Sequence, residues 1–370
     1  MSYPKVNLFD ICRPKQWKTI SSTDLLDSGY AVYGANGKIG FYSEYTHKNP
    51  TLMITCRGAT CGNVHISEPM SYINGNAMAL DELNESQAYI KYLYYYFKNR
   101  GFDDVISGSA QPQITGQGLT KIKIPLPPLA EQKRIAAILD KADAIRRKRQ
   151  QAIQLADDFL RSVFLDMFGD PVTNPKGWEV RNLDSCLDFL TSGSRGWAQY
   201  YSEQGDKFIR IQNVGKNKLL LADMAYINAP SGAEAIRTKI KKGDVLLSIT
   251  ADLGRASVVT EDISGGFINQ HLAILRVNQN QINPRYLAAF LSSDAGVRQF
   301  TSKNKSAVKA GLNFSDIKSL AIALPPLNLQ KKYEYIYEKL EQLHINNFKD
   351  AHQSNSLFNS LSQKAFSGQL

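Results

Sequence analysis

The chain has 370 residues, too many for one ordinary domain and enough for two or three domains of ~150 residues. Hydrophobic residues make up 43% and charged residues 21%, which is typical of globular proteins and excludes a mainly disordered chain. Because 44 basic residues face 34 acidic ones, the formal charge is +10, which favours a polyanionic partner such as nucleic acid. No apolar run approaches the ~18 residues of a membrane span, and residues 1–18 hold no apolar signal core, so we expect a cytoplasmic protein without a membrane partner.

The predicted elements alternate between two mixed regions and two long helices. In the first region, residues 51–56, 72–80 and 122–126 have the composition of strands, and residues 88–99 that of a short helix. Proline cannot sit inside a helix, so Pro127-Pro128 predicts the start of a helix that runs without proline or glycine to about residue 168. The second region repeats this order, with strands at 244–250, 267–275 and 320–324, a short helix at 284–293, and a final long helix after residue 326.

The chain contains an internal repeat with an offset of 198 residues. The aligned positions are Pro127, Pro128, Leu129, Gln132 and Lys133 with Pro325, Pro326, Leu327, Gln330 and Lys331. Residues 72–74 (YIN) also match residues 267–269 (FIN). The two mixed regions differ elsewhere, which indicates one scaffold that presents two different sets of loops.

Both long helices carry apolar residues at alternating spacings of three and four. The predicted seam consists of Ile135, Ile138, Ala142, Ile145, Phe159 and Val163 in the first helix, and Ile336, Leu340, Leu343, Leu357 and Leu361 in the second. Such a heptad pattern predicts that the two helices pack on each other as an antiparallel coiled coil. The alternative is that each helix packs on its own globular domain. The predicted fold class is α+β, with two mixed α/β domains, two long helices and pseudo-two-fold symmetry.

Signatures of catalysis are missing from the sequence. It has no phosphate-binding GxxxxGK[ST] loop, no GxGxxG fingerprint, no GxSxG and no HExxH. Asn283-Pro284-Arg285-Tyr286 is the nearest approach to a methyltransferase motif, but Asn before Pro is typical of a helix N-terminus. Four cysteines without CxxC spacing indicate buried thiols. We therefore predict no catalytic residues, no metal and no cofactor.

The order of segments resembles the specificity subunit of type I restriction–modification enzymes over essentially the whole chain. The most specific parts are PPLAEQKRIAAIL at the start of the first long helix and SLFNSLSQKAFSGQL at the end of the second. The second copy departs from the first, with Leu329 at the position of Glu131. The resemblance implies two target recognition domains (1–126 and 171–324), each recognising one half of a split double-stranded DNA site. It also implies spacer helices at 127–170 and 325–370, two methyltransferase subunits, two restriction (motor–nuclease) subunits, and no catalysis by the chain itself.

Arg, Lys, Asn and Gln are the side chains that bind base edges in the major groove. In the first domain the candidate DNA-binding residues are Arg57, Gln111, Gln113 and Gln117. In the second domain they are Arg195, Arg210, Gln212, Asn213, Lys303, Lys305 and Lys309. The second region carries 19 basic and 13 acidic residues and the first 12 and 10, so the positive excess lies mainly in the second.

Two functions from other classes remain open. A stand-alone DNA methyltransferase would bind S-adenosylmethionine without a partner, which the missing motifs disfavour. A coiled-coil protein scaffold would not show DNA binding that weakens as the salt concentration rises.

Overall fold

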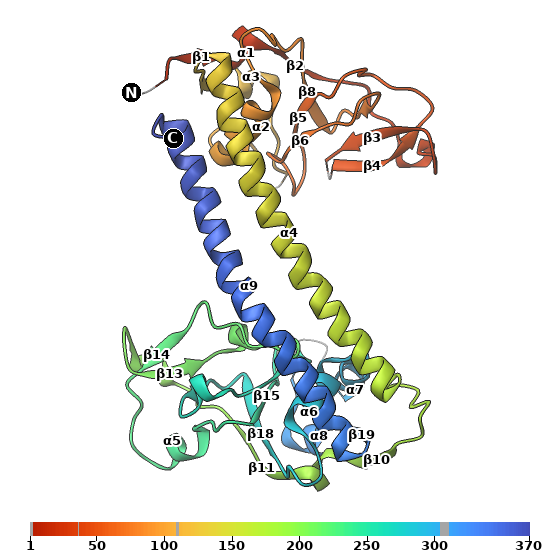
Figure 1. The fold of residues 1–370 in the computed structure, drawn as a ribbon, viewed down its shortest axis with the longest axis vertical. Helices are drawn as coiled ribbons and strands as arrows, with labels where there is room; N and C mark the ends of the chain where they lie inside the picture. Colours follow the sequence, from red (N-terminus) through yellow and green to blue (C-terminus); the bar gives the residue numbers. More distant parts are fainter. Residues whose placement is uncertain (1–2, 36, 109–110, 304–310) are drawn as a thin grey trace. The chain divides into compact units, whose positions relative to one another are not determined.

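The computed structural model describes residues 3–35, 37–108, 111–303 and 311–370, with side chains described for all of these except 344–354. By internal contacts the chain divides into unit 1, residues 1–152 with 347–370, and unit 2, residues 153–346. Both long helices, α4 (Leu129–Phe168) and α9 (Leu327–Ser367), contribute one part to each unit (Figure 1). No helix in the described ranges is long and apolar enough to cross a membrane.

In the residues that the structure describes, the globular part of unit 1 contains three small sheets and three short α-helices. Its helices are α1 (Leu8–Ile11), α2 (Ile90–Arg100) and α3 (Gly116–Leu119); its strands are β1 (Lys5–Asn7), β2 (Arg13–Gln16), β3 (Tyr30–Gly34), β4 (Gly37–Tyr42), β5 (Leu52–Thr55), β6 (Val64–Ile66), β7 (Tyr72–Ile73), β8 (Ala77–Asp81) and β9 (Lys123–Pro125). The sheet orders are β2-β8-β5-β6, β4-β3-β7 and β1-β9. Only the β3–β7 pair is parallel among these described strands.

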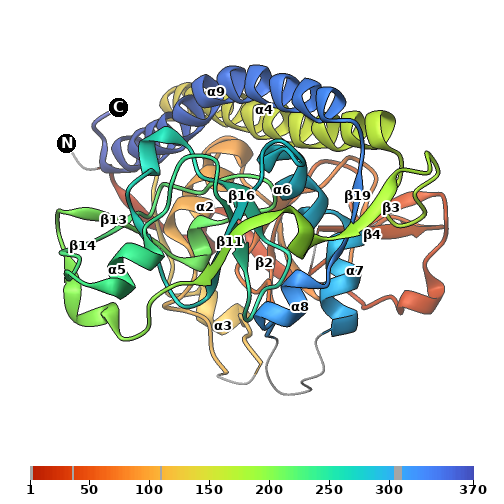
Figure 2. The same ribbon diagram turned by 90° about the horizontal axis from the view of Figure 1, so that it is seen from below.

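Unit 2 repeats this topology with additions. Its helices are α5 (Ala233–Thr238), α6 (Pro284–Ser292), α7 (Asp294–Lys303) and α8 (Phe314–Lys318); its strands are β10 (Glu179–Asn182), β11 (Leu187–Ser192), β12 (Tyr201–Ser202), β13 (Asp206–Ile209), β14 (Ala225–Ile227), β15 (Val245–Ser248), β16 (Ala256–Val258), β17 (Phe267–Ile268), β18 (Leu272–Val277) and β19 (Ala321–Leu324). The sheet orders are β11-β18-β15-β16, β12-β14-β13-β17 and β10-β19. Figure 2 shows β11 and β16 with α6 beside them.

The mixed α+β class and the internal repeat are confirmed by the matching sheets of the two units. The aligned YIN and FIN segments occupy equivalent places: Tyr72 pairs in parallel with Val32 of β3, and Phe267 pairs in parallel with Phe208 of β13. The two long helices begin at Leu129 and Leu327, 198 residues apart, directly after the Pro-Pro pairs.

A buried glutamine fixes the start of each long helix. Gln132 is fully buried; its Oε1 accepts from the backbone N–H of Tyr89 (2.8 Å), and its Nε2 donates to the first carbonyl of its Pro-Pro pair (2.8 Å). Gln330 makes the same two bonds, to the N–H of Asn283 (2.8 Å) and to its own first proline (2.7 Å). Since buried amide groups need partners, this joint ties each helix to the short helix of its domain.

The far end of each long helix completes a globular core through aromatic contacts. Phe366 of α9 packs on Tyr92 in unit 1 (5.6 Å between ring centroids), and Phe168 of α4 packs on Tyr286 in unit 2 (4.8 Å). Both tyrosine hydroxyls donate to backbone carbonyls, at 2.6 and 2.7 Å. Edge-to-face ring pairs stabilise a core beyond the burial of apolar area alone. Since each long helix also packs on a core near its start, α4 and α9 each stabilise the core of unit 1 and the core of unit 2.

The Asn-Pro motif is a helix cap, as predicted. The side-chain oxygen of Asn283 accepts from the N–H groups of Arg285 (2.8 Å) and Tyr286 (3.1 Å), and Pro284 occupies the first turn of α6. The motif therefore satisfies backbone donors of a helix that is itself part of the core.

The predicted seam is buried only toward the helix ends. Ile135 lies in the unit 1 core, Leu361 packs against that core and Val163 against the unit 2 core, while Ile138, Ala142, Ile336 and Leu340 are half-buried. In contrast, Ile145, Phe159, Leu343 and Leu357 are 50, 51, 64 and 57% exposed. Among the described side chains the seam is therefore not a continuous buried stripe, because the deeply buried apolar residues of each helix face a globular domain. The alternative, in which each helix packs on its own globular domain alone, is not what the structure shows, because each helix packs on one core near its start and on the other near its end.

Within unit 1 the parts of the two long helices that it contains run antiparallel. Arg134 near the start of α4 donates to the carbonyl of Leu370 (2.8 Å), and Arg146, three turns further, stacks over the ring of Phe358 (4.8 Å). As the residue number increases along α4, the number of its contact residue on α9 decreases, which is the order of an antiparallel pair.

Candidate nucleic-acid interface

In unit 1 the loop between β5 and β6 lies against the segment that precedes α3. Arg57 and Gln113 form an antiparallel bridge, and hydrogen bonds join Gly58 N–H to Pro112 O (3.1 Å) and Ile114 N–H to Cys56 O (3.0 Å). The structure thus brings two predicted base-binding residues together, and both are exposed. The other two are also exposed: Gln111 in the same segment and Gln117 on α3.

A buried hydroxyl holds the base of this loop. The Oγ1 of Thr55, which is fully buried, donates to the carbonyls of Thr60 and Asn63 and accepts from the N–H of Asn63 (2.9 Å). Because a side chain at the start of the loop bonds to the backbone at its end, the loop residues are presented from a fixed base.

In unit 2 a buried hydroxyl also holds the equivalent loop, which connects β15 and β16. The Oγ of Ser248, fully buried, donates to the carbonyl of Asp252 (2.6 Å) and accepts from the N–H of Arg255 (3.1 Å). The bridge that corresponds to Arg57 and Gln113 joins Thr250 to Gly311. Sequence reasoning missed this loop, although an alignment of TLMIT (51–55) with DVLLS (244–248) through the repeat would have found it.

The predicted DNA-binding residues of unit 2 differ in exposure and in hydrogen-bond partners. Arg195 is exposed on a turn where a Cβ at Gly193 would lie 2.1 Å from the carbonyl oxygen of Asn269, so only glycine permits this close approach. Lys303 is half-buried and donates to Ser319 Oγ (2.7 Å). Lys305 and Lys309 lie outside the described residues.

The cluster at 210–213 is mainly structural. Asn213 is fully buried; its Oδ1 accepts from Arg210 N–H (2.9 Å), and its Nδ2 donates to the carbonyls of Leu220 (3.0 Å) and Asp223 (2.9 Å). Arg210 also pairs with the carboxylate of Asp223 (3.0 Å), to which exposed Gln212 donates (3.2 Å). Asn213 uses its hydrogen-bonding groups to fold the turn, so it does not fit the base-binding role that we expected of it.

One triad-like array in unit 1 is a structural clamp. Nε2 of His47 lies 2.9 Å from Oδ1 of Asp81, and its Nδ1 lies 2.7 Å from Oγ1 of Thr46, an order familiar from hydrolases. However, the Thr46 hydroxyl accepts from the N–H of Ile73 (3.0 Å), and Trp17 both donates to Asp81 (3.0 Å) and packs on the imidazole (5.1 Å). Every polar group is engaged within the fold. In the described ranges no group of three or more His, Cys, Asp or Glu side chains could hold a metal.

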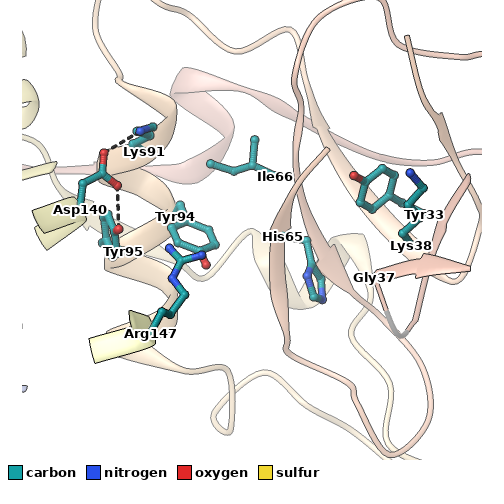
Figure 3. A pocket seen from close by; sticks show the side chains of 10 residues that line it. All are labelled: Tyr33, Gly37, Lys38, His65, Ile66, Lys91, Tyr94, Tyr95, Asp140 and Arg147. Atoms are coloured by element: carbon teal, nitrogen blue, oxygen red, sulfur yellow. Dashed lines mark hydrogen bonds and ion pairs between the residues drawn. The ribbon is translucent and has the colours of Figure 1, made fainter. Parts of the chain in front are cut away.

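A pocket of about 320 Å³ in unit 1 lies between the β3–β4 hairpin, β6, α2 and α4 (Figure 3). Asp140 of α4 accepts from Lys91 Nζ (2.6 Å) and Tyr95 Oη (2.7 Å), both on α2. Burial, together with the charge of Lys98, lowers the pKa of His65, so this imidazole is neutral near pH 7. Asp140 of α4 therefore pairs with Lys91 of α2 and holds the two helices together. We interpret the pocket as part of the packing between α4 and the globular part of unit 1.

The family model described as the type I restriction modification DNA specificity domain matches residues 3–155 and 175–353. Among curated proteins, the type I restriction enzyme EcoBI specificity subunit of Escherichia coli is 24% identical over 75% of this chain. The MjaIX specificity subunit of Methanocaldococcus jannaschii is also 24% identical, over 70% of it. The matches span 65% and 64% of those two relatives, a little under two thirds of their length.

The fold is also found in a solved structure. The crystal structure of a type I restriction–modification system S subunit from M. genitalium aligns over 99% of this chain and 96% of its own, with a TM-score of 0.68 and 15% identity. The family match covers both globular regions separately, as the repeat requires. The chain therefore belongs to the family of type I restriction–modification DNA specificity proteins.

Proposed function

We propose that this chain is the non-catalytic specificity subunit of a type I restriction–modification complex and recognises a split site in double-stranded DNA. Residues 1–126 and 171–324 are the two target recognition domains, and each recognises one half-site. Residues 127–170 and 325–370 are the spacer helices that set the distance between the halves.

One observation carries this proposal: a buried hydroxyl fixes the equivalent loop in each unit, β5–β6 in unit 1 and β15–β16 in unit 2, but the two loops present different residues. Thr55 and Ser248 fix equivalent loops, yet one loop presents an Arg57–Gln113 pair and the other a Thr250–Gly311 pair. Base edges are distinguished by the side chains that meet them. Two equivalent loops with different side chains therefore suit two different half-sites.

The proposed partners are two methyltransferase subunits and two restriction subunits. Four of the exposed apolar residues of the helices form two equivalent pairs, Ile145 with Leu343 and Phe159 with Leu357, each 198 residues apart. Apolar side chains that remain exposed on a helix favour a protein partner. A pseudo-two-fold chain offers such a surface twice, so one kind of subunit can bind in two copies.

The test is to assay the purified chain alone for DNA binding and methyl transfer. We expect binding to duplex DNA that weakens steeply between 50 and 200 mM salt, because phosphate contacts release counterions. We expect no methyl transfer from S-adenosylmethionine until methyltransferase subunits are added. Methylation by the chain alone would support the stand-alone enzyme, and the absence of salt-dependent DNA binding would support a protein scaffold.

A further inference from the structure

A groove of about 650 Å³ on unit 2 lies between α5, β11 and β18, at the side of the unit where β13 and β14 lie (Figures 1 and 2). Its lining includes Phe189, Ile236, Arg237, Lys239, Lys241 and Arg276. Four of these side chains are cationic, and none of the residues that line the groove is acidic. Ile236, at 80% exposure, is the most exposed of the large apolar side chains described.

Buried polar contacts hold the floor of the groove. Asp244, 1% exposed, accepts from Arg276 through both oxygens (2.7 Å each) and also accepts from the N–H of Lys241 (2.8 Å). Arg276 stacks over Phe189 (5.1 Å). The loop that carries Lys241 is therefore fixed by a buried carboxylate whose own charge is paired.

The opposite wall, α5, is tied to the turn that carries Arg195. Ser194 Oγ donates to the buried Thr238 Oγ1 (3.2 Å), and Arg237 donates to the carbonyl of Ser192 (2.7 Å). Arg195 lies next in the chain, so the groove adjoins one of the exposed base-binding candidates.

Two of the cations have no carboxylate to neutralise them. Lys242 pairs with Glu261 (3.3 Å), but in the part of unit 2 that the structure describes no acidic side chain lies within 4.0 Å of the Lys239 or Lys241 ammonium. Lys239 instead lies over the ring of Phe267 (5.9 Å). Unpaired ammonium groups on a fixed surface attract an anionic ligand.

The described residues of unit 1 form no counterpart to this groove wall. Its β4–β5 connection, residues 43–51, contains no helix, whereas the equivalent β14–β15 connection contains α5. Residues 233–242 hold four basic and one acidic residue, which is half of the +6 excess of residues 171–324. Half of the positive excess of the second region therefore lies in this ten-residue segment, part of which lines the groove.

We propose that the α5 groove binds the sugar–phosphate backbone of duplex DNA beside the half-site recognised by unit 2. This inference rests on the proposed function and adds a sequence-independent contact that unit 1 does not make. Lys239 and Lys241 each meet one phosphate, since lysine acts as a point charge toward phosphate oxygens. Exposed Ile236 packs against the sugars.

The test compares the full chain with Lys239→Gln/Lys241→Gln, using a 40-base-pair duplex of arbitrary sequence between 50 and 200 mM KCl. Each phosphate contact contributes about 0.9 to the slope of log K against log salt, so the variant should lose about 1.8 from that slope. Over this fourfold range the wild type should therefore lose about twelvefold more affinity than the variant. The matched control is Lys331→Gln/Lys332→Gln, which removes the same charge from two exposed lysines of α9 and should leave the slope unchanged.

The outcomes separate this inference from the proposed function. If the wild-type chain shows no salt-dependent DNA binding, the proposed function itself fails. If the wild type binds but the slopes of all three proteins agree, the groove does not contact DNA. An equal loss in the control would mean that net charge alone is responsible. An unchanged DNA slope with weakened binding of a methyltransferase subunit would assign the groove to an acidic protein segment instead.

Discussion

Thr55 and Ser248 show how single buried hydroxyls can position a recognition loop. Each hydroxyl accepts one backbone N–H and donates to at least one backbone carbonyl across the base of its loop. Neither residue touches DNA in our proposal. They are positioning residues, and their effect on recognition comes through the loop.

We expect Thr55→Val to loosen the unit 1 loop without unfolding the domain. The change keeps the shape of the side chain but removes the hydroxyl, which is one of two acceptors of the Asn63 N–H; the other is the Thr60 carbonyl (3.1 Å). The cost is therefore that of a lost hydrogen bond, about 0.5–1.5 kcal/mol. Amide hydrogen exchange at Gly62 and Asn63 should accelerate, while exchange in the loop of residues 249–255 stays the same. Ser248→Ala should give the reverse pattern.

Thr23→Val is the matched control for Thr55→Val. Its exposed hydroxyl donates to the side chains of Ser21 and Asp24, both outside the two loops, so exchange in both loops should stay at the wild-type rate. Slow exchange at Asn63 in the Thr55→Val protein would show that the hydroxyl does not hold the loop.

At the scale of elements, the exposed residues of α4 and α9 carry the proposed partner surface. Phe159→Ser and Leu357→Ser each remove an apolar side chain that is about half exposed, so the effect on folding should be small. Burial of such a side chain in an interface is worth roughly 1.5–3 kcal/mol. We expect each single variant to bind one methyltransferase subunit in place of two, and the double variant to bind none, as measured by native mass spectrometry.

Leu26→Ser is a suitable control for these helix variants, because Leu26 is 49% exposed but lies far along the chain from either long helix. It should leave two bound copies. If the Phe159→Ser/Leu357→Ser protein also retained two copies, the helix surface would not be the docking site.

The two long helices, the short helices α2 and α6, and the central strands could be predicted from local sequence, whereas β11–β14 and α5 were not. Proline pairs mark the start of α4 and α9, an Asn-Pro cap marks α6, and apolar runs give β5, β15 and β19. These signals are local because they depend on backbone hydrogen bonding and on proline geometry.

The seam and Asn213 show what the sequence could not decide. A heptad pattern records which positions are apolar, but not whether a helix, a globular core or another protein covers them. Ile135 and Ile145 look alike in sequence, yet one is fully buried and the other half exposed. Likewise, a polar residue in a loop can bind DNA or fold the turn, and for Asn213 only the three-dimensional partners show which.

At the scale of the molecule, the proposed spacing role can be tested by lengthening both helices. Seven residues inserted after Ala152 and seven after Asn346 fall at the boundary between the two units and leave both globular cores intact. Two added helical turns lengthen each helix by about 10 Å, or about three base pairs at ~3.4 Å each. They also turn one half-site by roughly a third of a DNA turn.

We therefore expect the lengthened protein to recognise a longer spacer or to lose binding. Lengthening α4 alone should abolish binding, because the two helices would no longer match. Methylation mapping of the complex would give the spacer directly, and an unchanged spacer at full affinity would mean that the helices do not set the distance.

The central claim is that each globular region recognises one half of a split DNA site. The most direct test is methylome sequencing of a host that expresses the chain with its methyltransferase partner. The measurement is made before and after residues 1–126 are exchanged for the same region of a relative. The account predicts a methylated site in two halves separated by a spacer of fixed length, with one half changed by the exchange and the other kept. A continuous site, or a change in both halves together, would contradict it.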